Sequence, residues 1–200
     1  MIMDCVQKNK EIFEKAFAEY GDDTRSCHWD KPMVMRYSEL LKIGDLENAS
    51  VLEIGCGLGG LYEYFRDDCG IKNISYKGID LVEGMIETAQ KKYPEAEFEV
   101  RDIIKNPLDK AEQYDYVFLC GVFNQGMETD FMKVMLQECF SYCKKGLAFN
   151  FISSYVNFYS EERSYHKPQE IFEFCVENLS RKIDMHHHYA KCDVSMFVYR

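Results

Sequence analysis

The sequence predicts an α/β fold: a Rossmann-like, doubly wound, mostly parallel sheet of seven strands with an antiparallel C-terminal hairpin. Three observations support this prediction. From residue 49 onward, short apolar runs alternate with amphipathic helical patterns, which is typical of a parallel sheet with helices on both faces. The first apolar run leads into a glycine-rich loop and then a helix. No helical pattern separates the last two runs, so they should pair as a hairpin at the sheet edge.

The first 48 residues differ from the rest because their pattern is helical throughout. Apolar side chains recur at helical spacing over residues 5–20, and Gly21 then breaks the pattern. A second amphipathic stretch covers residues 32–43, where Gly44 can serve as the C-cap. We expect residues 1–48 to form an N-terminal helical cover and residues 49–200 to form the main domain. No linker separates the two, so they should be one structural unit.

The main domain is expected to alternate strands and helices in a regular order. The apolar runs predict strands at residues 51–54, 74–79, 97–100, 114–119 and 147–152. The helical patterns predict helices at residues 60–68, 82–92, 128–144 and 168–179. Pro168 suits the first turn of its helix, where a missing N–H costs nothing. The last stretch, residues 185–199, predicts two strands around Lys191-Cys192-Asp193.

Composition narrows the class of protein before any motif is considered. The 200 residues are 46% hydrophobic and 29% charged, an ordinary globular composition for one domain. The net charge of −10 disfavours phosphate backbones, so we expect no nucleic-acid partner. No apolar run is long enough to span a membrane, and no secretory signal begins the chain. The nine cysteines are scattered without a CxxC pair, which favours free thiols in the cytoplasm. The oligomeric state is left open.

The strongest functional signal is the glycine loop that follows the strand predicted at residues 51–54. It reads Gly55-Cys56-Gly57-Leu58-Gly59-Gly60. Glycines permit positive φ and a close approach of the backbone to a ligand. Ligands of open α/β sheets bind beyond the carboxyl ends of the strands. Gly55, Gly57 and Gly60 also satisfy the dinucleotide pattern GxGxxG, so the loop alone does not distinguish between cofactors.

Three carboxylates near successive strand ends sharpen this signal. Glu53 lies just before the glycines, Asp80 ends the second strand and Asp102 ends the third. Asp80 follows Gly60 by about 20 residues, the distance at which an acid holds ribose hydroxyls. Glu53 would repel the pyrophosphate of NAD. S-adenosylmethionine carries an ammonium and a sulfonium and no phosphate, so the carboxylates favour it over a nicotinamide cofactor.

Four segments, in order, resemble the motif set of class I S-adenosylmethionine-dependent methyltransferases. They are Glu53-x-Gly55-x-Gly57-x-Gly59, Gly78-Ile79-Asp80, Arg101-Asp102-Ile103 and Tyr114-Asp115-Tyr116-Val117. The resemblance covers about residues 49–200, and a weaker one extends to small bacterial methyltransferases that act on small molecules. It implies S-adenosylmethionine as cofactor and S-adenosylhomocysteine as product. It also implies cofactor contacts from Glu53, Gly55, Cys56, Gly57, Asp80, Leu81, Asp102, Ile103, Cys120 and Gly121.

The acceptor site should be built from segments outside these motifs. Methyl transfer requires alignment of nucleophile and methyl group, and needs a base only when the nucleophile is protonated. His166 is the candidate base, because its pKa lies near working pH, although a loop histidine is the plainer interpretation. Asn124 could hydrogen-bond the acceptor, or simply cap a turn. Further candidates for acceptor binding come from the N-terminal cover and the loops after the fourth and fifth strands: Trp29, Arg36, Phe123, Tyr155, Tyr159 and Tyr165.

The sequence therefore predicts an enzyme that transfers a methyl group from S-adenosylmethionine to a small-molecule acceptor, at oxygen, mainly by proximity and alignment. It predicts no metal site, because His186-His187-His188 would alternate faces on a strand. Three alternatives stay open. One is an NAD(P)-dependent oxidoreductase that uses the same glycine loop. The others are a cofactor-binding subunit without activity and a methyltransferase that acts on proteins.

Overall fold

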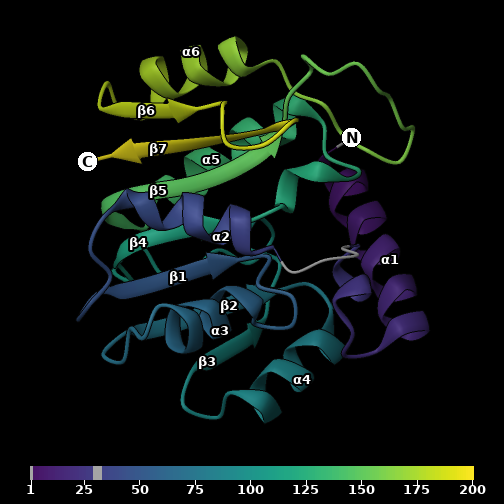
Figure 1. Ribbon diagram of the computed structural model, residues 1–200, viewed down its shortest axis with the longest axis vertical. Coiled ribbons are helices and arrows are strands. Elements are labelled where there is room, and N and C mark those ends of the chain that lie inside the picture. Colours follow the sequence, from purple (N-terminus) through teal and green to yellow (C-terminus); the bar gives the residue numbers. More distant parts are fainter. Residues whose placement is uncertain (1, 29–32) are drawn as a thin grey trace.

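The computed structural model describes residues 2–28 and 33–200 (Figure 1). It contains a seven-stranded sheet in the order β3-β2-β1-β4-β5-β7-β6. The strands are β1 Ser50–Ile54, β2 Ser75–Asp80, β3 Glu97–Val100, β4 Tyr114–Leu119, β5 Cys143–Ile152, β6 Ile183–His186 and β7 Asp193–Tyr199. Strands β1 to β5 are parallel, and β7 runs antiparallel between β5 and β6. The predicted fold class is confirmed, including the antiparallel pair of strands at the edge.

Helices cover both faces of the sheet, because apolar side chains project from both sides of its buried strands. On one face, apolar side chains of α2, α3 and α4 enter one core cluster. On the other face, α5 and α6 pack into a second cluster that includes Phe149 and Phe151 of β5. The bounds are α2 Val34–Leu40, α3 Gly60–Glu63, α4 Glu83–Lys92, α5 Thr129–Ser141 and α6 Pro168–Asn178.

Short helical segments extend or connect these elements. The 3-10 helix η2, Leu41–Ile43, continues α2, and the π-helical η3, Tyr64–Asp68, continues α3. Two further 3-10 helices, η1 Thr24–Cys27 and η4 Val122–Asn124, lie near the carboxyl edge of the sheet. Together, α3 and η3 cover the range of the helix predicted at residues 60–68.

The first helix, α1 Ile2–Tyr20, stands across the edge of the sheet at which β1 to β5 end (Figure 1). Its Phe17 packs on Gly84 at the start of α4, where an added Cβ would lie 2.3 Å from the ring. In contrast, α2 lies on a face of the sheet against β5 and β7. The two helical segments of the N-terminal cover therefore do different things: α1 closes an edge and α2 covers a face.

Three predicted element boundaries are wrong, and one is the start of the fifth strand, which lies at Cys143 instead of residue 147. The helix predicted at residues 128–144 ends at Ser141, because Cys143 already pairs with Tyr114 in the sheet. The strand predicted from residue 185 begins at Ile183 and ends at His186, so only the first residue of the histidine triplet lies on a strand. These errors lie at the ends of elements, which hydrophobic periodicity places less well than their centres.

Candidate functional site

The glycine loop folds as a tight turn at the carboxyl end of β1. Gly55, Gly57 and Gly59 all have positive φ, between 52° and 79°. Space is limiting as well, because a Cβ on Gly55 would lie 2.6 Å from Val122 and one on Gly57 would lie 3.0 Å from the Cys27 sulfur. The backbone N–H groups of Gly55 and Cys56 both donate to the carbonyl of Ile79, which ties the loop to β2. The glycines therefore hold a fixed conformation that a larger residue would disturb.

Asp80 connects the end of β2 to the glycine loop. Its Oδ2 accepts a hydrogen bond from the Gly57 N–H at 2.8 Å, and its Oδ1 accepts one from the Val82 N–H at 3.0 Å. Burial raises the pKa of the Asp80 carboxyl, while these backbone donors lower it. The carboxylate also occupies a loop N–H that a phosphate would otherwise use. Since a carboxylate has about four lone-pair positions, Asp80 can still accept from the hydroxyls of a ribose.

Glu53 lies beneath the loop, with only 2% of its surface exposed. The Tyr76 hydroxyl on β2 donates a hydrogen bond to its carboxylate. Burial raises the pKa of Glu53 to about 8, and the nearby negative charge of Asp80 acts in the same direction. Neither Glu53 nor Cys56 is among the side chains that line the adjoining pocket. Their predicted direct contact with the cofactor stays a prediction, and their present role is to support the loop from below.

Asp102 follows β3 and begins a turn. Its Oδ1 accepts hydrogen bonds from the backbone N–H groups of Ile104 and Lys105, at 3.0 and 3.1 Å. The Lys105 ammonium lies 3.4 Å from the other carboxylate oxygen. This geometry makes Asp102 a cap for its turn, and the same turn presents Ile103 to the pocket.

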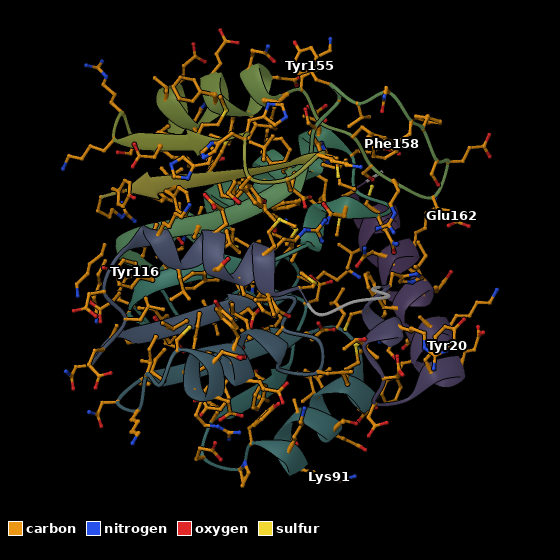
Figure 2. The ribbon with its side chains drawn as sticks, viewed as in Figure 1. Tyr20, Lys91, Tyr116, Tyr155, Phe158 and Glu162 are labelled. Atoms are coloured by element: carbon orange, nitrogen blue, oxygen red, sulfur yellow. The ribbon has the colours of Figure 1, made fainter. Side chains whose placement is uncertain are left out.

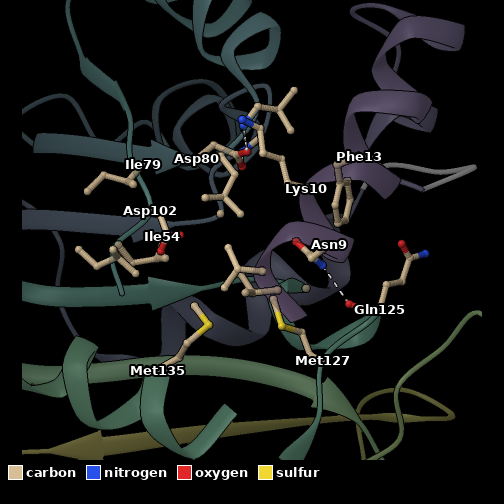
Figure 3. A pocket seen from close by; sticks show the side chains of 18 of the residues that line it. Asn9, Lys10, Phe13, Ile54, Ile79, Asp80, Asp102, Gln125, Met127 and Met135 are labelled. Carbon is tan, nitrogen blue, oxygen red and sulfur yellow. Dashed lines mark hydrogen bonds between the residues drawn. The ribbon is translucent and has the colours of Figure 1, made fainter. Parts of the chain in front are cut away.

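A pocket opens between these strand ends and α1 (Figure 3). The cavity volume is about 110 Å³. The predicted cofactor residues that line the pocket are Gly55, Gly57, Asp80, Leu81, Asp102, Ile103, Cys120 and Gly121. The Gly121 N–H donates to the Asn150 side chain at 2.8 Å, so the end of β4 is held against β5.

Helix α1 supplies one wall of the pocket that motif reasoning missed. Val6, Asn9, Lys10 and Phe13 all face the cavity (Figure 3). Asn9 is buried, and its Nδ2 donates to the backbone carbonyl of Gln125 at 2.9 Å. The sequence contained a signal for this contact, because Asn9 is a polar residue on the apolar face of an amphipathic helix, one turn from Phe13.

Asn124 and Gln125 lie at the other side of the pocket with unsatisfied amide groups. They are 1% and 5% exposed. Both polar side-chain atoms of Asn124 and the Oε1 of Gln125 have no hydrogen-bond partner among the described residues. Buried amides are normally paired, so this arrangement indicates groups that await a ligand or water. Asn124 was predicted to contact the acceptor, whereas Gln125 was missed because a glutamine after a strand carries no pattern of its own.

His166 lies outside both pockets described here and is 1% exposed. Its Nε2 contacts the Phe123 carbonyl at 3.0 Å, and its Nδ1 contacts the Thr129 hydroxyl at 3.0 Å. Burial lowers the pKa of the His166 ring. These contacts hold the loop after β5 against η4. Because both ring nitrogens of His166 are engaged, we assign it no role as a base. Phe123 is likewise fully buried and packs against Phe149.

Other residues proposed for the acceptor site lie away from the pocket. Arg36 forms a buried two-pronged ion pair with Asp193, with both contacts at 2.7 Å. Tyr155 and Tyr159 are exposed on the loop after β5, and Tyr159 stacks on Tyr165. Trp29 lies outside the described residues. The structure therefore does not bring this predicted set together at the pocket.

Two absences hold for the described part of the chain. Residues 2–28 and 33–200 contain no helix long and apolar enough to cross a membrane. Within the same ranges, no group of three or more histidine, cysteine or acidic side chains is arranged to hold a metal ion.

The residues at the strand ends fit S-adenosylmethionine. Asp80 can bind ribose hydroxyls, and the apolar side chains of Leu81 and Ile103 border the space beside it, where an adenine ring can pack. The Gly57 N–H, which a dinucleotide phosphate would need, is already bonded to Asp80. Cys120 and Gly121 leave room at the other end for the methionine part. The donor set therefore suits a nucleoside without phosphates.

Comparisons with known proteins agree with this geometry. Residues 51–146 match the family described as Methyltransferase domain. Over 75 residues the chain is 39% identical to the protein named "Putative methyltransferase 235L" from Invertebrate iridescent virus 6. That match covers 36% of this chain and 27% of the viral protein, so it spans only about a quarter of that relative's length.

Solved structures share the fold over nearly the whole chain. Magnesium protoporphyrin IX methyltransferase from Synechocystis PCC 6803 with bound S-adenosylhomocysteine aligns with a TM-score of 0.70, at 18% identity, over 96% of this chain and 99% of that one. A methyltransferase from Aquifex aeolicus aligns with a TM-score of 0.61, at 17% identity, over 93% and 97% of the two chains. The chain therefore contains a segment that matches a methyltransferase domain, and it has the fold of the S-adenosylmethionine-dependent methyltransferases.

Proposed function

We propose that the protein binds S-adenosylmethionine and transfers its methyl group to a small-molecule acceptor, at an oxygen atom. The observation that carries this proposal is the pocket at the carboxyl ends of β1, β2 and β4, where Asp80 is bonded to the glycine loop. When bound, the cofactor supplies an activated methyl group on a sulfonium. Asp80 would hold the ribose, Leu81 and Ile103 would enclose the adenine, and Cys120 with Gly121 would border the methionine part.

The chain's contribution to the reaction is alignment and exclusion of water. Holding the acceptor against the methyl group converts a bimolecular reaction into a local one. Asn124 supports an oxygen nucleophile, because its Nδ2 can donate to one lone pair while another lone pair faces the methyl carbon. The net charge of −10 supports a small molecule over a nucleic acid as the acceptor. Solved relatives include a human N-acetylserotonin methyltransferase in complex with S-adenosylmethionine, which is consistent with a small acceptor.

Isothermal titration tests the cofactor assignment. We expect one equivalent of S-adenosylhomocysteine to bind, and Asp80→Asn to weaken that binding at least tenfold because the ribose loses a charge-assisted acceptor. Asp68→Asn, an exposed carboxylate on η3, is the matched control and should bind as the parent does. Tight binding of NAD together with no binding of either sulfur nucleoside at millimolar concentration would support the oxidoreductase alternative.

The acceptor class needs a separate experiment. We would incubate the protein with cofactor labelled in the methyl group and a cell extract divided into small molecules and proteins. Label should enter the small-molecule fraction in a time-dependent manner, and mass spectrometry should find it on oxygen. Label that appears only on protein would instead establish the protein methyltransferase alternative. An absence of transfer to every fraction, with cofactor binding intact, would favour the non-catalytic subunit.

A further inference from the structure

A second cavity lies on the other side of α1 from the cofactor pocket. Its volume is about 760 Å³, and this value lies in the range of small-molecule binding sites. Neighbouring faces of α1 border the two cavities, because consecutive helical residues point about 100° apart. Asn9 and Phe13 line the cofactor pocket, and Lys8 and Ile12 line this cavity. The cavity extends between Tyr20 on α1 and Glu162 on the loop after β5, both of which Figure 2 labels on the same side of the molecule.

The two cavities share part of one wall. Gln125, Met127 and Arg163 line both of them. Asn124 lines the cofactor pocket next to Gln125. A molecule in the second cavity can therefore reach toward the methionine end of the cofactor pocket past the two unsatisfied amides.

The backbone that carries these amides is held rigidly. The Phe123 carbonyl contacts His166, the Asn124 carbonyl accepts from the Ser164 N–H at 2.9 Å, and the Gln125 carbonyl accepts from Asn9. Three successive carbonyls are thus fixed by the loop after β5 and by α1. In contrast, both polar side-chain atoms of Asn124 and the Oε1 of Gln125 have no partner among the described residues. This is the arrangement expected of a preorganised binding site, in which the ligand completes the hydrogen bonds.

His28 lines the second cavity with a free ring nitrogen. It ends η1 in a left-handed conformation with φ of 58°, which is uncommon for a residue other than glycine. Its Nε2 is buried and has no hydrogen-bond partner among the described residues. The ring also interacts with the backbone of Ile12 and packs edge-on against Phe13, with ring centroids 5.2 Å apart. Because Nε2 has no partner, we assign the bond to the Ile12 backbone, and the proton, to Nδ1, which leaves a lone pair on Nε2.

Burial and nearby charges act together on the pKa of the His28 ring. Burial lowers its pKa from the ordinary value, the Arg163 charge acts the same way, and the Glu162 charge opposes them. Helix α1 places Lys8, Lys15 and Glu19 around the same cavity, and the loops place Glu128 and Glu161 there. A neutral imidazole whose Nε2 lone pair has no partner among the described residues can accept a proton. His166, with both nitrogens engaged, cannot do so without breaking a bond.

We propose that the second cavity is the acceptor site, that it takes a small phenol or enol, and that His28 Nε2 is the base that receives the hydroxyl proton. This inference rests on the proposed function. The acceptor oxygen attacks the methyl carbon of the bound cofactor; an O–C bond forms while the C–S bond breaks, leaving its electron pair on sulfur. The hydroxyl proton passes to His28, which becomes an imidazolium and later releases the proton to water. Asn124 and Gln125 hold the remaining polar groups of the acceptor.

The class of hydroxyl follows from the strength of the base. An imidazole whose pKa lies below about 6.5 is a weak base, and it assists transfer best from a hydroxyl whose own pKa is not far above it. A phenolic hydroxyl has a pKa of about 10 and meets this condition, whereas an alkyl alcohol is much less acidic. The amides of Asn124 and Gln125 offer two acceptors and one donor, which suits a ring with a neighbouring hydroxyl or N–H group.

Imidazole ¹⁵N spectroscopy on the full chain saturated with S-adenosylhomocysteine tests the site directly, with phenol and anisole as probes. We expect His28 to carry its proton on Nδ1 and to titrate below pH 6.5. Phenol should shift its Nε2 signal and bind at least tenfold more tightly than anisole, which has no proton to donate. A proton on Nε2, or equal effects of the two probes, would overturn the proposal. Because Gln125 borders both cavities, Gln125→Met should weaken phenol binding at least fivefold and by a larger factor than it weakens nucleoside binding.

Turnover provides the catalytic readout. With a panel of phenols and enols, His28→Gln should lower kcat at least 100-fold with little change in KM, and abolish the decline of rate at acid pH. His187→Gln, an exposed histidine after β6, is the matched control and should behave as the parent does. No turnover of any panel member, with S-adenosylhomocysteine still bound, would overturn the acceptor assignment alone. Failure to bind the nucleoside in the same sample would instead overturn the proposed function.

Discussion

Glu53 is a buried acid whose only described hydrogen-bond partner is the Tyr76 hydroxyl. Its pKa of about 8 in the folded protein compares with about 4.3 in an unfolded chain. Between these values the folded state retains a proton that the unfolded state has released, so this group destabilises the fold as pH rises from about 4 to 8. Bound S-adenosylmethionine would bring a positive charge to the neighbouring pocket. This charge would favour the ionised form of Glu53.

The loss of stability that Glu53 causes as the pH rises gives a prediction for the protein without cofactor. Glu53→Gln keeps an acceptor for Tyr76 and removes the ionisation, so the variant should melt at a higher temperature than the parent at pH 8. The difference should shrink as the pH falls and reach zero only below about pH 4, where Glu53 is neutral in both the folded and the unfolded state. Thermal unfolding followed by circular dichroism measures both values, with the exposed Glu87→Gln as control. A difference that grows toward low pH would show that Glu53 is ionised when buried.

Individual site residues were predictable from sequence to the extent that backbone geometry dictates them. Asp80 and the glycines of the loop were found because their positions follow from a strand end and a turn. His166 and Arg36 were placed wrongly for a different reason: each has a buried partner, Phe123 or Asp193, that is distant in sequence. Sequence patterns show the type of a side chain, but its partners depend on which segments the fold brings together.

Among the secondary elements, α1 has the largest effect on access to the site. With α1 in place, about 110 Å³ of the cofactor pocket is open, less than the roughly 300 Å³ at which small-molecule pockets begin. Asn9 holds α1 to Gln125, and Phe17 rests on Gly84. We therefore expect α1 to swing outward before the nucleoside enters and to close over it afterwards, as lids do.

Hydrogen exchange measured by mass spectrometry tests this movement. Asn9→Leu removes one buried hydrogen bond, worth about 1 kcal/mol, so exchange in residues 6–20 should become about fivefold faster. S-adenosylhomocysteine should slow exchange in the same residues. Gln7→Leu is the control, because Gln7 is on the same helix and bonds only to Glu11 on its surface. Unchanged exchange in both Asn9→Leu and the nucleoside complex would show that α1 is a fixed wall.

At the scale of the whole molecule, Arg36 and Asp193 connect α2 to β7 across 157 positions of sequence. Removing one partner of a buried ion pair leaves the other charge without compensation, which costs about 3–5 kcal/mol. We expect Asp193→Asn to lower the free energy of unfolding in urea by an amount of this order. Asp23→Asn, which breaks an exposed pair with Arg25, should cost much less, because solvent screens that pair. Equal losses in the two variants would show that Arg36 is solvated.

Strand order has a consequence for how the chain is made. Strand β7 is the latest of the seven in sequence, yet it lies inside the sheet, with β5 on one side and β6 on the other. While residues 193–199 are still within the ribosome, β5 has an open edge and β6 has nothing to pair with. An exposed edge is a template for aggregation, so the growing chain is exposed to misassociation along β5 until β7 has emerged and paired with it.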